Sequence, residues 1–221
     1  MDLNKLIKLL GSLYPSIFIG AAALLSAYAY WLLSPAFAES IGRVAEAAPN
    51  SFMLFSLDTD MAKCPDTFID QATEGPYYKT GSPERSDLIE EGVIGEPIKL
   101  SGYVFDKDCN PIAGAWLDFW QADGNGNYDN RGYRLRGHQF TDKRGKYLLR
   151  TVMPGEYPGR TSHIHVKVGK QADGVITTSQ LYFPGRKQNA EDRIFSKSMV
   201  IMLDKSMDGG NVGYFNFRLN Q

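Results

Sequence analysis

Two of the chain's three histidines, His163 and His165, stand one residue apart in the run SHIHVKV. Their alternation with Ile164 and Val166 predicts a β-strand, in which side chains two positions apart point to the same face. The two imidazoles would then project together, and imidazole is a common metal ligand. Taken alone, a pair of exposed or buried structural histidines would explain the same pattern.

Two tyrosines stand in turn-rich segments that could meet this face. Tyr157 lies in PGEYPGR, six positions before His163, where prolines on either side predict a rigid turn. Tyr128 lies in GNGNYDN, a loop after the predicted strand GAWLDFWQA. Loops at strand ends often carry functional side chains on a rigid scaffold. Each tyrosine could equally serve in packing, since the chain has twelve.

The composition describes an ordinary domain with a core. The chain has 221 residues, 43% of them hydrophobic, and a formal net charge of −1. This size is enough for one domain. A nucleic-acid-binding protein would be expected to carry a basic patch, so the composition predicts no nucleic-acid partner.

The N-terminus differs from the rest of the chain. Two lysines precede the apolar run Leu13–Leu33, which ends in SPAFAES. Ala36 and Ala38 give the small-x-small pattern of a signal-peptidase site, so we expect a signal peptide over 1–38, cleaved after Ala38. An uncleaved membrane anchor is the alternative, because about 20 apolar residues can span a bilayer. Both interpretations predict an exported protein, periplasmic or extracellular.

Cys64 and Cys109 are the chain's two cysteines, and neither belongs to a C-x-x-C motif that would suggest zinc. In an oxidising compartment they favour a disulfide. It would close a loop of about 45 residues and stabilise the fold by about 4 kcal/mol on the chain-entropy model. Two buried free thiols are the alternative.

The remaining chain is predicted to be all-β. Residues 39–63 are expected to be a linker or arm, and 64–221 an antiparallel β-sandwich with little helix. Alternating segments separated by turn signals support this fold class. A hairpin is expected around Asp142–Gly145, and one short helix over Ala190–Ser198.

Several motifs together resemble the intradiol ring-cleavage dioxygenases, most closely their protocatechuate branch. The resemblance covers most of Cys64–Gly185, and its motifs occur in the family's order: TEGPYY, GAWLDFWQADGNGNYDN, TDKRGKYLLRTVMPGEYPGR, RTSHIHVKV and TTSQLYFPG. An ordered set of unrelated motifs is far more specific than a single His-x-His pair.

The resemblance implies one non-haem Fe(III) per chain, bound by Tyr128, Tyr157, His163 and His165. The residue chemistry agrees, because two phenolate oxygens favour ferric over ferrous iron and imidazole suits iron. Zinc rarely has two tyrosine ligands.

The resemblance also implies a reaction. A catechol-type substrate, such as catechol or protocatechuate, would react with dioxygen and open between its two hydroxyl-bearing carbons to a cis,cis-muconate. Tyr157 would leave the metal and take up a proton as a base. Arg160 would stabilise charge developing on the ring, Gln180 would lie close to the substrate, and Gly75 and Pro76 would line the mouth of the site. A surface salt bridge for Arg160 and an ordinary strand position for Gln180 are the simpler alternatives.

The sequence also departs from the family pattern. The segment between Tyr157 and His163 is short, and in the family this loop forms part of the pocket wall. The sequence therefore leaves undecided which substituent the ring of the substrate carries. A single chain must supply what two different subunits supply in the protocatechuate branch, or use homo-oligomer contacts.

Two rival functions are a β-sandwich binding module without turnover and an envelope-anchored interaction protein. A different metal hydrolase would need a carboxylate base near HIH, and that motif has none.

Overall fold

The computed structural model describes residues 62–174 and 176–221. The chain divides into two units, Met1–Asp58 and Thr59–Gln221, and every described residue belongs to the second. The predicted leader over 1–38 and all but the last two residues of the predicted linker over 39–63 therefore lie outside the described residues. Within the described part, no helix is long and apolar enough to cross a membrane.

Strands dominate the described residues, and two short 3₁₀ helices, η1 and η2, interrupt them. In chain order the elements are β1 (Pro97–Phe105), β2 (Trp116–Gln121), β3 (Arg136–Phe140), β4 (Lys146–Val152), β5 (His163–Gly169), β6 (Ile176–Tyr182), η1 (Lys187–Ala190), η2 (Lys197–Met199), β7 (Met202–Lys205), β8 (Asn211–Tyr214) and β9 (Phe217–Arg218).

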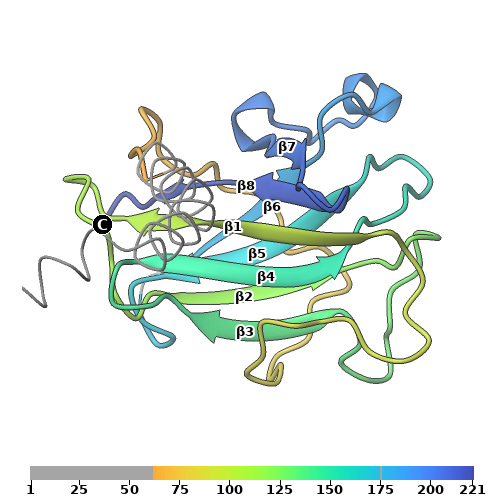
Figure 1. Cartoon of the computed structure of the whole chain (residues 1–221), viewed down its shortest axis with the longest axis horizontal. Coiled ribbons are helices and arrows are strands. Elements are labelled where there is room, and N and C mark those ends of the chain that lie inside the picture. Colours follow the sequence, from red (N-terminus) through yellow and green to blue (C-terminus); the bar gives the residue numbers. More distant parts are fainter. Residues whose placement is uncertain (1–61, 175) are drawn as a thin grey trace, which may run out of the picture. The chain divides into compact units, whose positions relative to one another are not determined.

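The strands form two sheets that overlap in the view of Figure 1. One has the order β4-β1-β8-β7, with β9 also paired to β1, and the other has the order β3-β2-β5-β6. All pairings are antiparallel except those of β1 with β8 and β9. The prediction of an all-β sandwich with little helix is confirmed.

Alternating residues of both sheets build one core. Leu100 and Leu149 from the first sheet and Phe119, Ile164 and Val166 from the second are all fully buried in a single hydrophobic cluster. Burying such side chains is the main favourable term in folding, at about 1.5–3 kcal/mol for each large apolar residue. This core is the rigid support on which the second sheet presents its other face.

The prediction of a hairpin around Asp142–Gly145 is wrong. A tight turn does form there, because the Asp142 carboxylate accepts the backbone N–H groups of Arg144 and Lys146 at 2.8 and 2.9 Å, and Gly145 adopts a φ of +79°. However, β3 pairs with β2, whereas β4 pairs with β1 in the other sheet. The turn carries the chain from sheet to sheet, and burial of residues such as Leu149 in the core selects the strand partner.

The prediction of one short helix over Ala190–Ser198 is also wrong. η1 ends at Ala190 and η2 covers only the far end of the segment. Between them the Asp192 carboxylate accepts the backbone N–H groups of Ile194, at 3.1 Å, and Thr161, at 3.0 Å. Side chains that bind nearby backbone in this way compete with helix formation.

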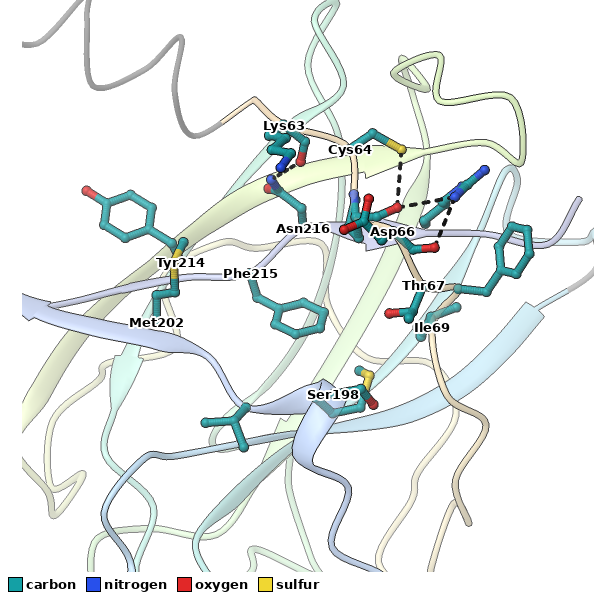
Figure 2. Close-up of a pocket in the computed structure, with 15 residues that line it drawn as sticks. Lys63, Cys64, Asp66, Thr67, Ile69, Ser198, Met202, Tyr214, Phe215 and Asn216 are labelled. Atoms are coloured by element: carbon teal, nitrogen blue, oxygen red, sulfur yellow. Dashed lines mark hydrogen bonds between the residues drawn. The ribbon is translucent and has the colours of Figure 1, made fainter.

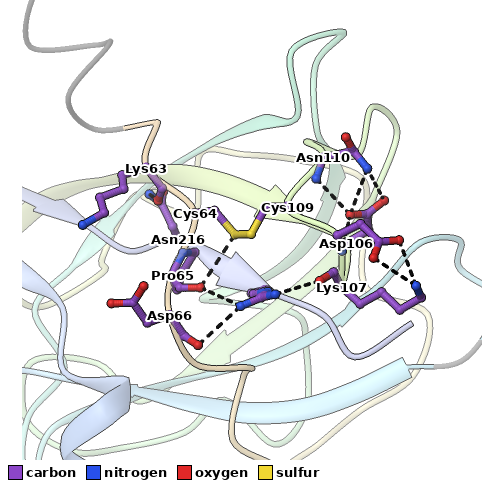
Figure 3. The surroundings of a disulfide bond; sticks show 11 residues. Lys63, Cys64, Pro65, Asp66, Asp106, Lys107, Cys109, Asn110 and Asn216 are labelled. Atoms are coloured by element: carbon purple, nitrogen blue, oxygen red, sulfur yellow. Dashed lines mark hydrogen bonds and ion pairs between the residues drawn. A yellow bond between two sulfur atoms is a disulfide. The ribbon is translucent and has the colours of Figure 1, made fainter.

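A disulfide fastens the arm that precedes β1. Cys64 and Cys109 are bonded, with Cα atoms 5.6 Å apart (Figure 3). The Arg218 guanidinium supports the same junction, because it donates to the carbonyls of Pro65, at 3.3 Å, and Lys107, at 2.7 Å. The arm is thereby tied both to the turn after β1 and to β9.

Replacing both cysteines by serine is expected to lower the free energy of unfolding by about 4 kcal/mol, because the unfolded chain loses the constraint of a loop of about 45 residues. Urea denaturation of both proteins measures the difference. Reductant should destabilise the wild type and leave the Cys64→Ser, Cys109→Ser variant unchanged. Equal stability of the wild type with and without reductant would contradict the expectation.

Candidate metal centre

A row of side chains crosses the second sheet on the face opposite the core. Cα-paired residues of antiparallel strands present their side chains to the same face. The paired positions, from β3 through β2 and β5 to β6, are Arg136, Trp120, His165 and Gln180. His163 shares this face, two positions before His165 on β5, while Ile164 between them lies in the core.

His163 is held with one nitrogen free to bind a metal. Only 2% of the residue is exposed, and its Nδ1 lies 2.6 Å from the carbonyl oxygen of Thr161. A carbonyl can only accept, so the proton must be on Nδ1, and Nε2 keeps its lone pair. Support of this kind by a backbone carbonyl orients metal-binding histidines.

His165 presents its Nε2 to the same point. Its Nε2 lies 3.1 Å from that of His163. Two nitrogens that bind one metal ion at about 2.1 Å each would lie about 3.0–3.4 Å apart. The ring stacks on Trp120, with centroids 4.7 Å apart and planes 11° apart. Its Nδ1 is buried without a hydrogen-bond partner among the described residues, so stacking is what orients this ring.

Tyr157 reaches the histidine pair from the loop before β5. Backbone hydrogen bonds between Tyr157 and Arg160 close a tight turn. The Tyr157 hydroxyl lies 3.4 Å from Nε2 of His163. The turn predicted from PGEYPGR therefore returns the phenol to the imidazole face.

Glycines bring the Tyr128 loop against the Tyr157 loop. A Cβ atom on Gly126 would lie 2.5 Å from the carbonyl oxygen of Glu156, and one on Gly155 would lie 2.5 Å from the carbonyl oxygen of Gly124. Any side chain there would force the loops apart. With glycine in place, the rings of Tyr128 and Tyr157 lie edge to face, with centroids 6.0 Å apart.

The Tyr128 hydroxyl is the observation that tests whether a metal fits. It is buried and has no hydrogen bond of normal geometry among the described residues, although the Tyr157 hydroxyl lies near enough to add to the effect of burial in raising its pKa. An unsatisfied buried hydroxyl costs about 1–3 kcal/mol, and a metal ion coordinated by the oxygen would remove that cost. Two phenol oxygens and two imidazole nitrogens thus converge as a donor set that fits a metal ion.

Burial sets the charge state of these four groups. Burial lowers the pKa of His163 to about 4, with a further contribution from Arg160. Burial and the neighbouring His163 hold the pKa of His165 well below its ordinary value. Both imidazoles are therefore neutral at pH 7, as ligands must be. Burial also raises the pKa of Tyr128 and Tyr157, so each phenol keeps its proton unless a cation replaces it.

Arg160 and Gln180 meet beside the four donors. The Arg160 guanidinium donates to Oε1 of Gln180, and its Nη1 lies 3.5 Å from the Tyr157 hydroxyl. Gln180 in turn donates to the carbonyl of Thr73 at 3.0 Å. Asp192 accepts from Nε of Arg160 at 2.9 Å. The side chain of Arg160 is 17% exposed, so this is a mostly buried network and not a surface salt bridge.

The arm before β1 lies over the same face. Gly75, at a φ of +72°, lies so close to His165 that an added Cβ would be 3.6 Å from Cε1 of that ring. Pro76 follows it directly in the chain, and Tyr77 then stacks on Tyr128, with ring centroids 4.4 Å apart. The chain itself therefore brings the Gly75 segment to the candidate centre.

The structure also brings in residues that the sequence reasoning missed. They are Tyr77, Trp120 and Asp192. Trp120 alternates with core residues along the predicted strand GAWLDFWQA, which was a usable signal for its face. The sequence does not show that this strand pairs with the one that carries His165. No group of three or more His, Cys, Asp or Glu side chains forms another candidate metal site within the described ranges.

A separate hollow of about 400 Å³ lies next to the disulfide, where Cys64, Met202 and Phe215 contribute to its lining (Figure 2). None of the four metal-donor candidates lines it. Its lining residues bring no converging catalytic groups together, so we assign the chemistry to the outer sheet face.

The metal-free protein is expected to lose stability as pH falls from about 7 toward 4. Both histidines have folded-state pKa values below the unfolded value of about 6.5, so the unfolded chain binds protons first. Each histidine contributes up to about 1.4 kcal/mol per pH unit in this window. Urea denaturation across the range measures the slope. The variant His163→Asn should show a shallower slope, and an unchanged slope would contradict the assignment.

Comparison with known proteins gives this site its context. A family model described as "Dioxygenase" matches residues 73–221. A chlorocatechol 1,2-dioxygenase from Pseudomonas sp. (strain P51) is 30% identical over 139 residues, covering 52% of this chain and 55% of that enzyme. The protocatechuate 3,4-dioxygenase beta chain of Burkholderia cepacia is 29% identical over 163 residues, covering 60% and 69%. The alignment thus spans little more than half the length of the first relative.

Solved structures agree. The dioxygenase domain of a dioxygenase–carbohydrate-binding protein fusion from Streptomyces sp. SirexAA-E superposes with a TM-score of 0.66 at 44% identity, covering 70% of this chain and 99% of that one. An intradiol ring-cleavage dioxygenase from Tetranychus urticae gives a TM-score of 0.64 at 27% identity, covering 70% and 95%. Family match, fold and likeness to these enzymes converge: the chain belongs to the intradiol ring-cleavage dioxygenases, a family of oxidoreductases.

Proposed function

We propose that this protein uses one non-haem Fe(III) ion to cleave a catechol-type ring with dioxygen. The ring would open between its two hydroxyl-bearing carbons, and both oxygen atoms would enter a cis,cis-muconate-type product. The observation that carries the proposal is that the side chains of Tyr128, Tyr157, His163 and His165 meet at one partly buried place on the outer sheet face. Relatives that act on catechol, chlorocatechol and protocatechuate support the substrate class.

The donor set favours ferric iron. Phenolate oxygens are hard, negatively charged ligands, and imidazole completes a set that suits iron. When bound, ferric iron would act as a Lewis acid that orients the catecholate and makes it reactive toward dioxygen. In the protein, Tyr128 and the two histidines are the residues that would hold it, and Tyr157 is the fourth donor.

Tyr157 is placed to manage a substrate proton. A catechol must lose its hydroxyl protons to chelate a metal through both oxygens. Burial raises the pKa of the Tyr157 phenol, so its oxygen holds a proton once it no longer binds a cation. Tyr157 would therefore accept one of the catechol protons as a general base. Arg160, at 3.5 Å from the same hydroxyl, keeps the oxygen oriented.

Arg160 and Gln180 would act on the ring itself. A guanidinium fixed in a mostly buried position can stabilise negative charge that develops on a ring carbon, and such preorganised charge is a large catalytic term. Gln180 holds one edge of the guanidinium. Gly75 and Pro76 would line the way in for the substrate, since the Gly75 backbone packs against His165 without a side chain to block the approach.

The visible absorption spectrum of the iron-loaded domain tests the proposal. Tyrosinate ligation to ferric iron should give a broad charge-transfer band, and anaerobic catechol should shift it to longer wavelength. With oxygen, the protein should consume dioxygen and form a muconate. A protein that stays colourless after ferric iron is supplied would overturn the four-donor assignment and favour a binding module without turnover.

Variants assign the band to its ligands. Tyr128→Phe and Tyr157→Phe should each weaken the band and lower kcat by at least about 100-fold, because each removes a phenolate from the metal or a base from the reaction. Tyr133→Phe is the matched control, since the hydroxyl of Tyr133 donates to the carbonyl of Thr80 and is not among the four donors. A band of undiminished intensity in both ligand variants would contradict the tyrosinate assignment.

We further propose that the protein is exported, with residues 1–38 as a signal peptide and 64–221 as the catalytic domain. The apolar run and the small residues before Glu39 support this proposal. Expression of the full chain in a Gram-negative host, followed by cell fractionation and N-terminal sequencing, tests it. Cleavage after Ala38 is expected. An intact N-terminus in the membrane fraction would instead indicate an anchor, and an intact chain in the cytoplasm would overturn export.

A further inference from the structure

One buried carboxylate sits behind the catalytic arginine. Asp192 lies between η1 and η2, and its side chain is 1% exposed. A carboxylate this deeply buried needs partners, because an unpaired buried charge is strongly destabilising. Its partners therefore indicate what it is there to hold.

Asp192 joins two segments of the chain. One carboxylate oxygen accepts from Nε of Arg160 at 2.9 Å and from the backbone N–H of Thr161 at 3.0 Å. The other oxygen accepts from the backbone N–H of Ile194 at 3.1 Å. The last contact anchors the carboxylate to its own segment, and the first two anchor the Arg160–Thr161 segment to the carboxylate.

These contacts leave the Arg160 guanidinium little freedom. Its Nε is bound to Asp192, another edge donates to Gln180, and Nη1 faces the Tyr157 hydroxyl. A planar guanidinium held on two edges by fixed acceptors has a set position and plane. Gln180 is neutral, so Asp192 supplies the negative charge in this arrangement.

The same carboxylate also bears on His163. The backbone N–H of Thr161 donates to the Asp192 carboxylate, and the carbonyl of Thr161 accepts the Nδ1 proton of His163 at 2.6 Å. Thr161 is fully buried, and its hydroxyl also donates to the side-chain oxygen of Asn189 in η1, at 2.7 Å. Asp192 therefore fixes the residue that sets which His163 nitrogen is free.

We propose that Asp192 is the positioning residue of this active site, which holds the Arg160 guanidinium against Gln180 and Tyr157 and anchors Thr161 behind His163. Asp192 does not touch the donor atoms and acts through Arg160 and Thr161. The inference rests on the proposed function, because the role of Arg160 in ring cleavage is part of that function.

A double-mutant cycle tests the proposal in the iron-loaded protein. Asp192→Asn should lower kcat for catechol cleavage about 10- to 100-fold, as expected for loss of a supporting partner. KM should change little, because the lost interaction acts on developing charge. In an Arg160→Gln background the same substitution should lower kcat by a clearly smaller factor, because only the route through Thr161 remains. Independent, multiplicative losses would overturn the proposal, because Asp192 would then not act through Arg160.

Two further variants separate positioning from folding. Asp87→Asn is the matched control, since it removes an ion pair with Arg150, at 2.5 Å, in the other sheet, and should leave kcat unchanged. If Asp192→Asn fails to fold, Asp192→Glu keeps the charge but moves the carboxylate by one methylene. It should lower kcat by a larger factor with Arg160 present than in the Arg160→Gln background, where only the route through Thr161 remains. Equal fold losses in both backgrounds would overturn the proposal.

A measurement that needs no turnover distinguishes the positioning role of Asp192 from the proposed ring-cleaving function. In the metal-free protein, the Nε–H of Arg160 should be protected from solvent exchange by NMR, and Asp192→Asn should remove that protection. Protection with no turnover of any catechol would overturn the proposed function alone. Turnover in the wild type with an unprotected Nε–H would overturn the positioning role alone.

Discussion

Burial of polar groups on the outer face of the second sheet is the constraint on which the rest of this structure depends. Two imidazoles are buried there and two phenols are partly buried, beside a mostly buried guanidinium. Each unpaired group would cost about 1–3 kcal/mol, so the chain supplies partners for most of them. Thr161 binds His163, while Asp192 and Gln180 bind Arg160. The Tyr128 hydroxyl has no hydrogen bond of normal geometry among the described residues, and a bound cation would satisfy its oxygen.

The hydrophobic core of the sandwich holds this arrangement in place. Ile164 and Val166 are fully buried in the core between the sheets, and the same strand turns its alternate residues outward. Side chains alternate along a strand, so a shift of the strand by one residue would exchange its two faces. Burial of the apolar face therefore fixes the register of the strand. The position of the imidazoles is therefore set by hydrophobic packing on the far side of the backbone, well away from the chemistry.

Three peripheral segments then close over the face, each for a different reason. The Tyr128 and Tyr157 loops meet because glycines at Gly126 and Gly155 allow backbone contact. The Gly75 arm is drawn over by the hydrogen bond from Gln180 to Thr73 and is tied further back by the disulfide. The segment around Asp192 enters through its carboxylate. A site assembled from separate segments combines rigid support at the sheet with walls built from loops, the parts of a fold that vary most between relatives. The names of the relatives, which include chlorocatechol, hydroxyquinol and protocatechuate dioxygenases, indicate different catechols.

The sequence by itself determined the local chemistry of this protein. Strand alternation predicted that His163 and His165 share a face, the prolines around Tyr157 predicted its turn, and ordered motifs predicted the family. Tertiary structure decided what those local signals leave open. It sent β3 and β4 to different sheets, because partner choice follows core burial and not turn chemistry. It also brought Asp192 to Arg160 across 32 positions, a contact with no local pattern, because only the folded backbone places a distant carboxylate beside a buried cation.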